Sequence, residues 1–89
     1  MRPCVYILIS IKDGKRYIGS TVNIERRLRE HVGGHVKATS GRLPVYLYGV
    51  RYFEKIEMAA TFEKKYKRSS GQLTRDIKNG KIILQQGIA

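Results

Sequence analysis

Residues 4–20 read CVYILISIKDGKRYIGS, which is two apolar runs joined by a short polar turn. The first run, residues 4–11, is rich in β-branched and aromatic side chains, and these favour strands. Asp13-Gly14 is a strong signal for a tight hairpin turn, and residues 16–20 resume the strand pattern. This segment therefore predicts an antiparallel β-hairpin, and the other elements are placed around it.

The turn also predicts which residues of the hairpin face each other. If Asp13 and Gly14 are its two central residues, the numbers of facing residues sum to 27, so Ser10 faces Tyr17. Tyr6 and Tyr17 then share one face of the hairpin but lie about 13 Å apart, too far for direct contact. Two interpretations fit this spacing: a pair of half-buried sheet tyrosines, or two tyrosines that flank a substrate group.

A helix is predicted directly after the hairpin. Asn23 is a good N-cap, and Gly33-Gly34 ends the helical pattern. The apolar positions of this helix are Ile24, Leu28 and Val32, and the ion pairs expected on its outer face are Glu25/Arg29 and Arg26/Glu30.

Two polar residues interrupt the apolar side of this helix. On a helical wheel, Arg27 and His31 lie within about 60° of Ile24, where apolar side chains are expected. Arg26 and Arg29 point away from the core. For Arg27 and His31, the residues alone leave two interpretations open, either side chains that reach solvent from the core edge or members of a functional site.

The remaining segments complete an α+β chain. Their predicted elements are a basic, glycine-containing loop over 33–44, a third strand over 45–53, a helix over 57–68, a short helix around 73–77 and an extended piece over 82–84. The order is β-β-α-β-α-α, in a single domain over residues 1–89.

Glu63 borders the apolar side of the second long helix, which is formed by Met58, Ala59, Phe62 and Tyr66. A carboxylate held on a helix beside an apolar surface can ligate a metal ion. The alternative is an ordinary i,i+4 ion pair between Glu63 and Lys67. None of the other six acidic residues combines a helical position with the edge of an apolar surface in this way.

Length and charge narrow the functional classes. A chain of 89 residues has room for one modest core, which excludes two-domain enzymes and Rossmann dehydrogenases. Its 18 basic and 7 acidic residues give a net charge of +11, which favours nucleic acid as a partner before an anionic membrane. With Cys4 as the only cysteine, and with neither a membrane span nor a secretory signal expected, the sequence predicts a cytoplasmic protein.

Several of these residues together resemble the GIY-YIG nuclease family. The matching motifs are Val5-Tyr6-Ile7, Tyr17-Ile18-Gly19, Asn23 with Arg26-Arg27-Leu28, Glu30-His31 and the later Glu63, so the resemblance covers residues 3–68. Cys4 stands where the family has its first glycine, and the asparagine found late in some members has no clear counterpart. The resemblance implies a small three-stranded antiparallel β-sheet flanked by helices, and cleavage of phosphodiester bonds with one divalent metal ion.

The resemblance also implies roles for individual residues. It assigns Tyr6 and Tyr17 to the active-site surface, Arg27 to the scissile phosphate, His31 to a supporting acid/base role, and Glu63 to Mg²⁺ or Mn²⁺. The expected function is therefore a metal-dependent DNA endonuclease, selective for DNA structure or acting in repair or recombination. The alternative is a nucleic-acid-binding module that keeps the fold without catalysis.

Nucleic-acid contacts are expected from basic side chains outside the catalytic set, namely Arg26, Lys37, Arg42 and Lys67. Lys37 and Arg42 lie in the 33–44 loop, for which two interpretations stay open: a mobile flap over the nucleic-acid backbone, or an ordinary exposed loop. A protein partner that supplies targeting fits a domain of this size.

Overall fold

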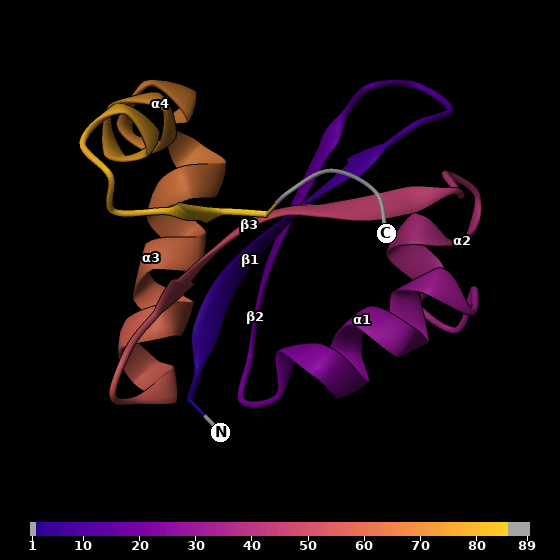
Figure 1. Cartoon of the computed structure of the whole chain (residues 1–89), viewed down its shortest axis with the longest axis horizontal. Helices are drawn as coiled ribbons and strands as arrows, with labels where there is room; N and C mark the ends of the chain where they lie inside the picture. Colours follow the sequence, from indigo (N-terminus) through magenta and orange to yellow (C-terminus); the bar gives the residue numbers. More distant parts are fainter. Residues whose placement is uncertain (1, 86–89) are drawn as a thin grey trace.

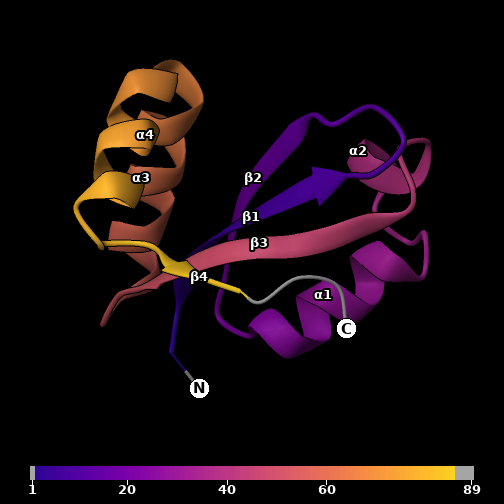
Figure 2. The same cartoon turned by 45° about the horizontal axis from the view of Figure 1, so that its top comes forward.

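The computed structural model describes residues 2–85, which form one antiparallel β-sheet with helices on both faces (Figure 1). The elements in chain order are β1 (Cys4–Ser10), β2 (Arg16–Thr21), α1 (Ile24–Val32), α2 (Lys37–Ser40), β3 (Val45–Tyr52), α3 (Ile56–Arg68), α4 (Ser70–Lys78) and β4 (Ile83–Leu84). The strand order across the sheet is β2-β1-β3-β4 (Figure 2). The α+β class is confirmed, but the sheet has four strands where three were expected, because the extended piece near residue 83 pairs with β3.

The hairpin forms as predicted, but its register differs from the prediction. Facing residues sum to 25, so Tyr6 lies opposite Gly19 and Tyr17 lies opposite Leu8. The cause is a four-residue loop over 11–14, closed by the hydrogen bond from the Ser10 N–H to the Lys15 carbonyl at 3.0 Å. Because the shift is two residues, every side chain keeps its predicted face while β2 slides along β1.

The Ser10 side chain explains the longer loop. Its hydroxyl is buried, accepts a hydrogen bond from the Asp13 N–H at 3.3 Å, and donates to the Arg42 carbonyl at 2.6 Å. The Asp13 carboxylate in turn accepts from the Lys15 N–H at 2.9 Å, and Gly14 takes the left-handed conformation with φ of 70°. The Asp-Gly pair therefore forms the second half of a larger loop.

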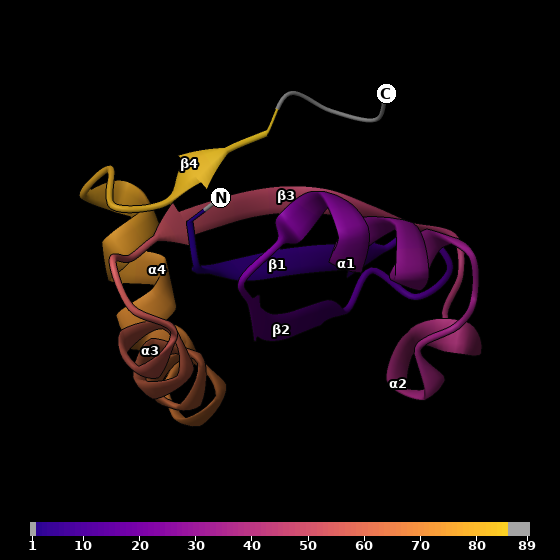
Figure 3. The same ribbon diagram turned by 90° about the horizontal axis from the view of Figure 1, so that it is seen from below.

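Alternate residues of the central strand β1 build two separate cores. Val5 and Ile7 pack on the side of α3 and α4, whereas Tyr6 and Leu8 pack on the side of α1. Figure 3 shows the strands stacked from β4 to β2, with α1 and α2 at one end and α3 and α4 at the other. Because β2 is an edge strand, side chains from the core on one face of the sheet and from the core on the other face can approach each other around it.

Helix α1 begins as expected, with the Asn23 side chain accepting from the Arg26 N–H at 3.0 Å. Its buried face differs from the prediction, because Val32 is 56% exposed and His31 is fully buried. The expected ion pairs also differ, since Arg27 pairs with Glu30 at 3.0 Å. His31 replaces Val32 in the interior because it finds two hydrogen-bond partners there, as described below.

The segment over 33–44 is more ordered than the predicted loop. It contains the short helix α2, whose Thr39 is fully buried. Arg42 lies against the hairpin loop, with its Nε atom 3.4 Å from Asp13 Oδ2. These contacts fasten the C-terminal end of α2 and the residues after it to the body of the protein. A flap motion of this segment stays a prediction.

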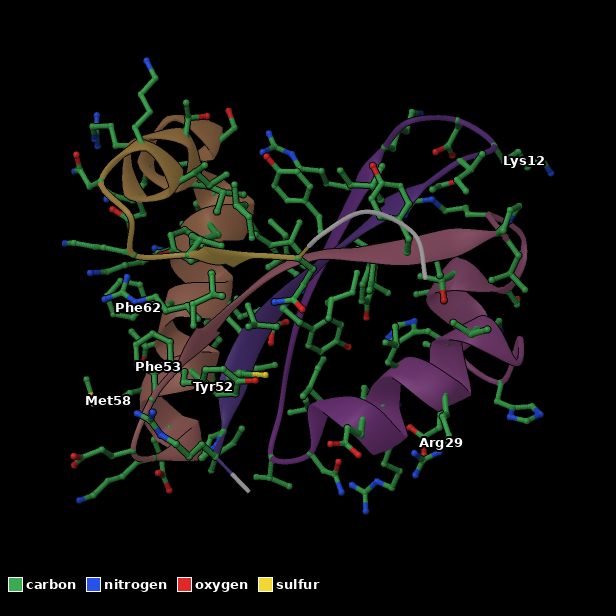
Figure 4. The ribbon with its side chains drawn as sticks, in the orientation of Figure 1. Lys12, Arg29, Tyr52, Phe53, Met58 and Phe62 are labelled. Atoms are coloured by element: carbon green, nitrogen blue, oxygen red, sulfur yellow. The ribbon has the colours of Figure 1, made fainter. Side chains whose placement is uncertain are left out.

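Helix α3 keeps most of its predicted apolar face. Ala59 and Tyr66 are buried, and Phe62 stacks on Phe53 with ring centroids 5.1 Å apart. Met58 departs from the prediction, because it is 49% exposed and its side chain points away from the sheet (Figure 4). The face that α3 presents to the core therefore includes Ile56 and Ala59 and leaves Met58 outside.

A buried polar group holds α3 and α4 to β3, and we call it the Tyr66 cluster; its members are Tyr66, Asp76, Arg51 and Gln72. Asp76 is 2% exposed and accepts from the Tyr66 hydroxyl at 2.6 Å, from Gln72 at 3.0 Å and from Arg51 at 3.2 Å. The Arg51 guanidinium also lies over the Phe62 ring, 4.3 Å from its centroid. The buried and fully hydrogen-bonded Asp76 carboxylate therefore joins β3, α3 and α4.

Candidate active site

Tyr6 crosses from β1 over the neighbouring strand β2. A Cβ atom built on Gly19, which faces Tyr6 in the sheet, would lie 2.5 Å from the Tyr6 hydroxyl. No side chain fits there, so Gly19 is the residue that lets the phenol lie across β2. The tyrosine hydroxyl is thereby carried from the central strand to the edge of the sheet.

The Tyr6 hydroxyl belongs to a chain of hydrogen bonds that we call the Tyr6 cluster; its members are Arg27, Tyr6, His31 and Thr39. Arg27 Nε donates to the Tyr6 oxygen at 3.4 Å, and that oxygen lies 2.9 Å from His31 Nε2. On the other side of the imidazole, His31 Nδ1 lies 2.7 Å from Thr39 Oγ1. Strand β1 and helices α1 and α2 each contribute to this cluster.

Tyr17 lies against the same group. Its ring centroid is 6.3 Å from that of Tyr6 and 5.1 Å from that of His31. The expected separation of about 13 Å is therefore wrong, because the observed register makes Tyr17 a diagonal neighbour of Tyr6 across the strands. The prediction that both tyrosines share one face is confirmed.

Burial and charge set the protonation of this cluster. Burial raises the pKa of Tyr6 to about 12, although the hydrogen bond from Arg27 opposes that change. Burial also lowers the pKa of His31, and the nearby Arg27 charge lowers it further. At neutral pH the site therefore holds a protonated phenol, a neutral imidazole and a guanidinium cation.

Glu63 approaches β2 from the opposite face of the sheet. Its carboxylate accepts from the Ser20 hydroxyl at 2.5 Å and from the Lys67 ammonium at 2.7 Å. Burial tends to raise the pKa of Glu63, but the hydrogen bonds from Lys67 and Ser20 outweigh it, so the net pKa is lowered. Glu63 is therefore an ionised carboxylate on α3, 23% exposed at its side chain.

The two groups meet around the β2 edge. Lys67 Nζ lies 6.0 Å from the centre of the Tyr17 ring, and the Glu63 charge contributes to the raised pKa of Tyr6. Two cavities of about 220 and 280 Å³ lie elsewhere, beside Ile24 and Tyr52, and neither is lined by these residues. The candidate site thus lies along the edge strand β2.

Comparison with known proteins identifies the family. The family model of the GIY-YIG catalytic domain matches residues 2–77.

The chain belongs to the GIY-YIG nuclease family. It is similar to the UPF0213 protein of Bacillus licheniformis, at 38% identity over 73% of this chain and 68% of that protein. It is also similar to the UPF0213 protein of Natronomonas pharaonis, at 40% identity over 74% and 78% of the two chains. The solution NMR structure of a UPF0213 protein from Bacillus halodurans matches with a TM-score of 0.54 and 34% identity, covering 91% of this chain and 86% of that one.

Membership of the GIY-YIG family fixes the coarse biochemistry. The family is one of nucleases, so the substrate class is nucleic acid, and its members generally use divalent metal ions. Among residues 2–85, no helix of this GIY-YIG domain is long and apolar enough to cross a membrane.

The donor groups at the candidate site decide whether a divalent cation fits there. Within the described part of the chain, no group of three or more His, Cys, Asp or Glu side chains gathers in one place. Glu63 is nevertheless an ionised carboxylate beside the Ser20 hydroxyl, and Mg²⁺ prefers such oxygen ligands, with one or two carboxylates and the rest from water and substrate. The residues therefore fit one Mg²⁺ or Mn²⁺ ion, which Glu63 would hold with the Ser20 hydroxyl beside it.

Of the five residues expected to be catalytic, Tyr6, Tyr17, Arg27 and His31 come together on one face of the sheet. Glu63 lies on the other face, where it pairs with Lys67. The other basic residues expected to bind nucleic acid lie apart. Arg26 and Lys37 are exposed on α1 and α2, whereas Arg42 is partly neutralised by Asp13. Direct phosphate contacts by Arg26 and Lys37 stay a prediction.

Sequence analysis missed two members of the GIY-YIG site. Thr39 was placed in a loop, and nothing in its local pattern signals a partner eight residues earlier in the chain. Ser20 extends the Tyr17-Ile18-Gly19 motif by one residue, and strand alternation places its side chain on the face opposite Tyr17, toward α3. That alternation was the available signal for Ser20.

Proposed function

We propose that this protein is a metal-dependent endonuclease that hydrolyses phosphodiester bonds in DNA at the β2 edge. The observation that carries the proposal is the meeting, around one edge strand, of an ionised carboxylate, a phenol hydrogen-bonded to a neutral imidazole, and the cation of Arg27. Phosphodiester hydrolysis needs these three functions: a metal anchor, a route for a proton and a charge for the phosphate.

Arg27 is the proposed phosphate ligand. Its side chain is 36% exposed, and it is held by Tyr6 on one side and Glu30 on the other. The hydrogen bonds from Arg27 to Tyr6 and then to Glu30 raise its pKa above the usual value, so it stays charged. Because Tyr6 and Glu30 already hold the guanidinium in place, Arg27 can donate to two phosphate oxygens with little further loss of side-chain entropy.

Tyr6 and His31 form the proposed proton route. A phenol with a pKa of about 12 does not ionise by itself near neutral pH. His31 Nε2 lies 2.9 Å from the phenol oxygen, so Tyr6 can take a proton from attacking water while it passes its own proton to the imidazole. Tyr17 closes this group on the solvent side by packing against both rings.

Glu63 is the proposed metal ligand, and the ion supplies charge stabilisation for the phosphate and the leaving oxygen. Ser20 orients the carboxylate from β2. Lys67 balances the carboxylate charge, and with an ion held by Glu63 its ammonium would be available to the substrate backbone.

The proposed substrate is recognised mainly by its phosphates. The net charge is +11, and Arg26 and Lys37 extend the basic surface along α1 and α2. No element resembles a base-reading helix, so we propose selectivity for DNA structure, such as flaps or branches, as used in repair and recombination.

A second candidate function is a non-catalytic nucleic-acid-binding module. One observation favours it, because both oxygens of the Glu63 carboxylate already hold partners, Ser20 and Lys67. If this alternative holds, no metal ion replaces Lys67 in its ion pair with Glu63, and the protein uses only its basic surface to bind nucleic acid.

A cleavage screen separates the two functions. Plasmid, single-stranded, flap and branched DNA are incubated with the protein in Mg²⁺, Mn²⁺ or EDTA, alongside Glu63→Gln and the matched control Glu57→Gln on the same helix. We expect cleavage only with metal, its loss in Glu63→Gln, and normal cleavage by Glu57→Gln. Metal-independent binding without cleavage of any substrate would establish the binding module instead.

A further inference from the structure

Thr39 places a hydroxyl group against the imidazole of His31 in the interior. Both residues are 0% exposed, and Thr39 Oγ1 lies 2.7 Å from His31 Nδ1. A buried polar contact this short is a hydrogen bond, in which Nδ1 either donates to the Thr39 hydroxyl or accepts from it. The contact joins α2, which belongs to the basic segment over 33–44, to the proposed proton route.

The arrangement of donors decides the direction of these hydrogen bonds. A neutral imidazole has one N–H, so His31 donates to either Thr39 or Tyr6 and accepts from the other. The Tyr6 oxygen already accepts from Arg27 Nε. A phenol is also more acidic than an aliphatic alcohol, which makes Tyr6 the better donor and Thr39 the better acceptor.

We propose that Thr39 is a positioning residue of this site: its oxygen accepts the Nδ1–H of His31 and keeps Nε2 bare and directed at the Tyr6 hydroxyl. The effect of this tautomer on catalysis rests on the proposed nuclease function. The tautomer itself does not depend on that function. With the opposite tautomer, Nε2 would donate to Tyr6, and the proton route would be blocked. Thr39 itself stays away from the substrate.

Two substitutions isolate the hydroxyl from the shape of the side chain. Thr39→Val keeps the branched shape and removes the acceptor, whereas Thr39→Ser keeps the hydroxyl and removes a methyl group. Thr74→Val is the matched control, because Thr74 is exposed on α4 and its hydroxyl donates to the Ser70 carbonyl of the same helix. Thermal unfolding of each variant establishes that it is folded before further measurement.

The first readout is ¹⁵N NMR of the His31 ring at about pH 8, where a histidine is neutral. The exposed His35 serves as an internal reference. We expect the wild type and Thr39→Ser to carry the His31 proton on Nδ1, and Thr39→Val to lose that signature. A wild type with the proton on Nε2, or an unchanged tautomer in Thr39→Val, would overturn the proposal. The wild-type spectrum alone decides it if Thr39→Val does not fold.

The second readout is cleavage, with kcat and KM determined separately. In Thr39→Val we expect kcat to fall by about 10-fold to 100-fold with KM unchanged, and in Thr39→Ser we expect most of the rate to return. Loss confined to KM would overturn a positioning role. If the wild type cuts no DNA while the NMR result is as expected, the nuclease function fails and the assignment of Thr39 stands.

Discussion

The Tyr6 cluster and the Tyr66 cluster use the same kinds of residue on opposite faces of the sheet. Each contains a buried tyrosine whose hydroxyl contacts a titratable partner and an arginine. In the Tyr66 cluster the partner is the ionised Asp76, which accepts three hydrogen bonds and holds its charge in place. In the Tyr6 cluster the partner is the neutral His31, which can take up a proton.

The two clusters also differ in their place in the sheet. The Tyr66 cluster is enclosed between β3, α3 and α4, whereas the Tyr6 cluster reaches the edge strand β2. A buried tyrosine paired with a fixed charge stabilises the fold. The same residue paired with a neutral base at an edge is suited to chemistry.

We expect the largest difference between the two clusters when the hydroxyl of Tyr6 or of Tyr66 is removed. We expect Tyr6→Phe to lower the cleavage rate by about 100-fold to 10,000-fold, because the proton route is lost while the ring stays over Gly19. Tyr66→Phe should leave the rate of folded protein unchanged and lower the free energy of unfolding by about 2 kcal/mol, because Asp76 loses one hydrogen bond. Single-turnover cleavage and urea unfolding measure the two effects, and equal loss of cleavage in both variants would contradict the division.

Asp76 tests whether the Tyr66 cluster serves stability alone. Asp76→Ala leaves the partly buried Arg51 without its anion and removes the acceptor of Tyr66 and Gln72, so we expect the free energy of unfolding to fall by about 2–3 kcal/mol with cleavage retained. Urea denaturation at neutral pH measures this change. Loss of cleavage in a variant that is still folded would connect the two clusters.

The pH dependence of stability gives a second view of Asp76. Burial opposes ionisation of Asp76, but hydrogen bonds from Tyr66 and Gln72 outweigh it and hold its pKa below the usual value. A carboxyl group with a lower pKa in the folded state stabilises the protein above its unfolded pKa of about 4, and this contribution is lost as the pH falls through the folded value. The stability difference between the wild type and Asp76→Ala should therefore narrow below about pH 4, in urea titrations at successive pH values.

A substitution of Lys67 tests whether its ammonium competes with a metal ion for the proposed ligand Glu63. Its ammonium is half exposed and occupies one oxygen of Glu63, so Lys67→Gln should tighten Mn²⁺ binding to the free protein by about 3-fold to 10-fold. Lys65→Gln on the same helix, whose side chain lies over Phe62, is the control. Equal affinities in a Mn²⁺ titration followed by electron paramagnetic resonance would show that Lys67 and the metal do not compete.

The smallest expected effect concerns the basic surface beyond both clusters. Each neutralised phosphate adds a slope of about −0.9 to log K against log salt, so Lys37→Ala should reduce the slope for DNA binding by about one unit. Arg42→Ala should reduce it by less, because Asp13 already offsets part of its charge. Fluorescence anisotropy over a range of salt concentrations gives both slopes, and a salt-independent complex would contradict phosphate recognition.

Much of the fold and most of the site could be predicted from sequence, since strand alternation, the Asn23 cap and the tyrosine motifs are local signals. The hairpin register could not, because Asp13-Gly14 fits loops of two or four residues and the buried Ser10 hydroxyl decides between them. Helical periodicity favoured Val32 over His31 for the interior. The partners that reverse this choice, Tyr6 and Thr39, come from other elements of the chain.

The burial of Asp76 is a second feature that could not be predicted from its own helix. Asp76 follows Leu73 by three residues and so shares its helix face, but its partners Arg51 and Tyr66 precede it by 25 and 10 residues and lie on other elements. Periodicity describes one element at a time. Buried polar groups depend on how elements pack together.

The position of the candidate site along the edge strand β2 has a consequence for substrate size. A cleft encloses a small molecule on several sides, whereas an edge offers it few contacts and holds it weakly. A polymer backbone is a ridge that can lie along such an edge and gain contacts over many phosphates on either side of the one that reacts. We therefore expect dinucleotides and small phosphodiesters to be poor substrates compared with long DNA, with the penalty expressed as weak binding.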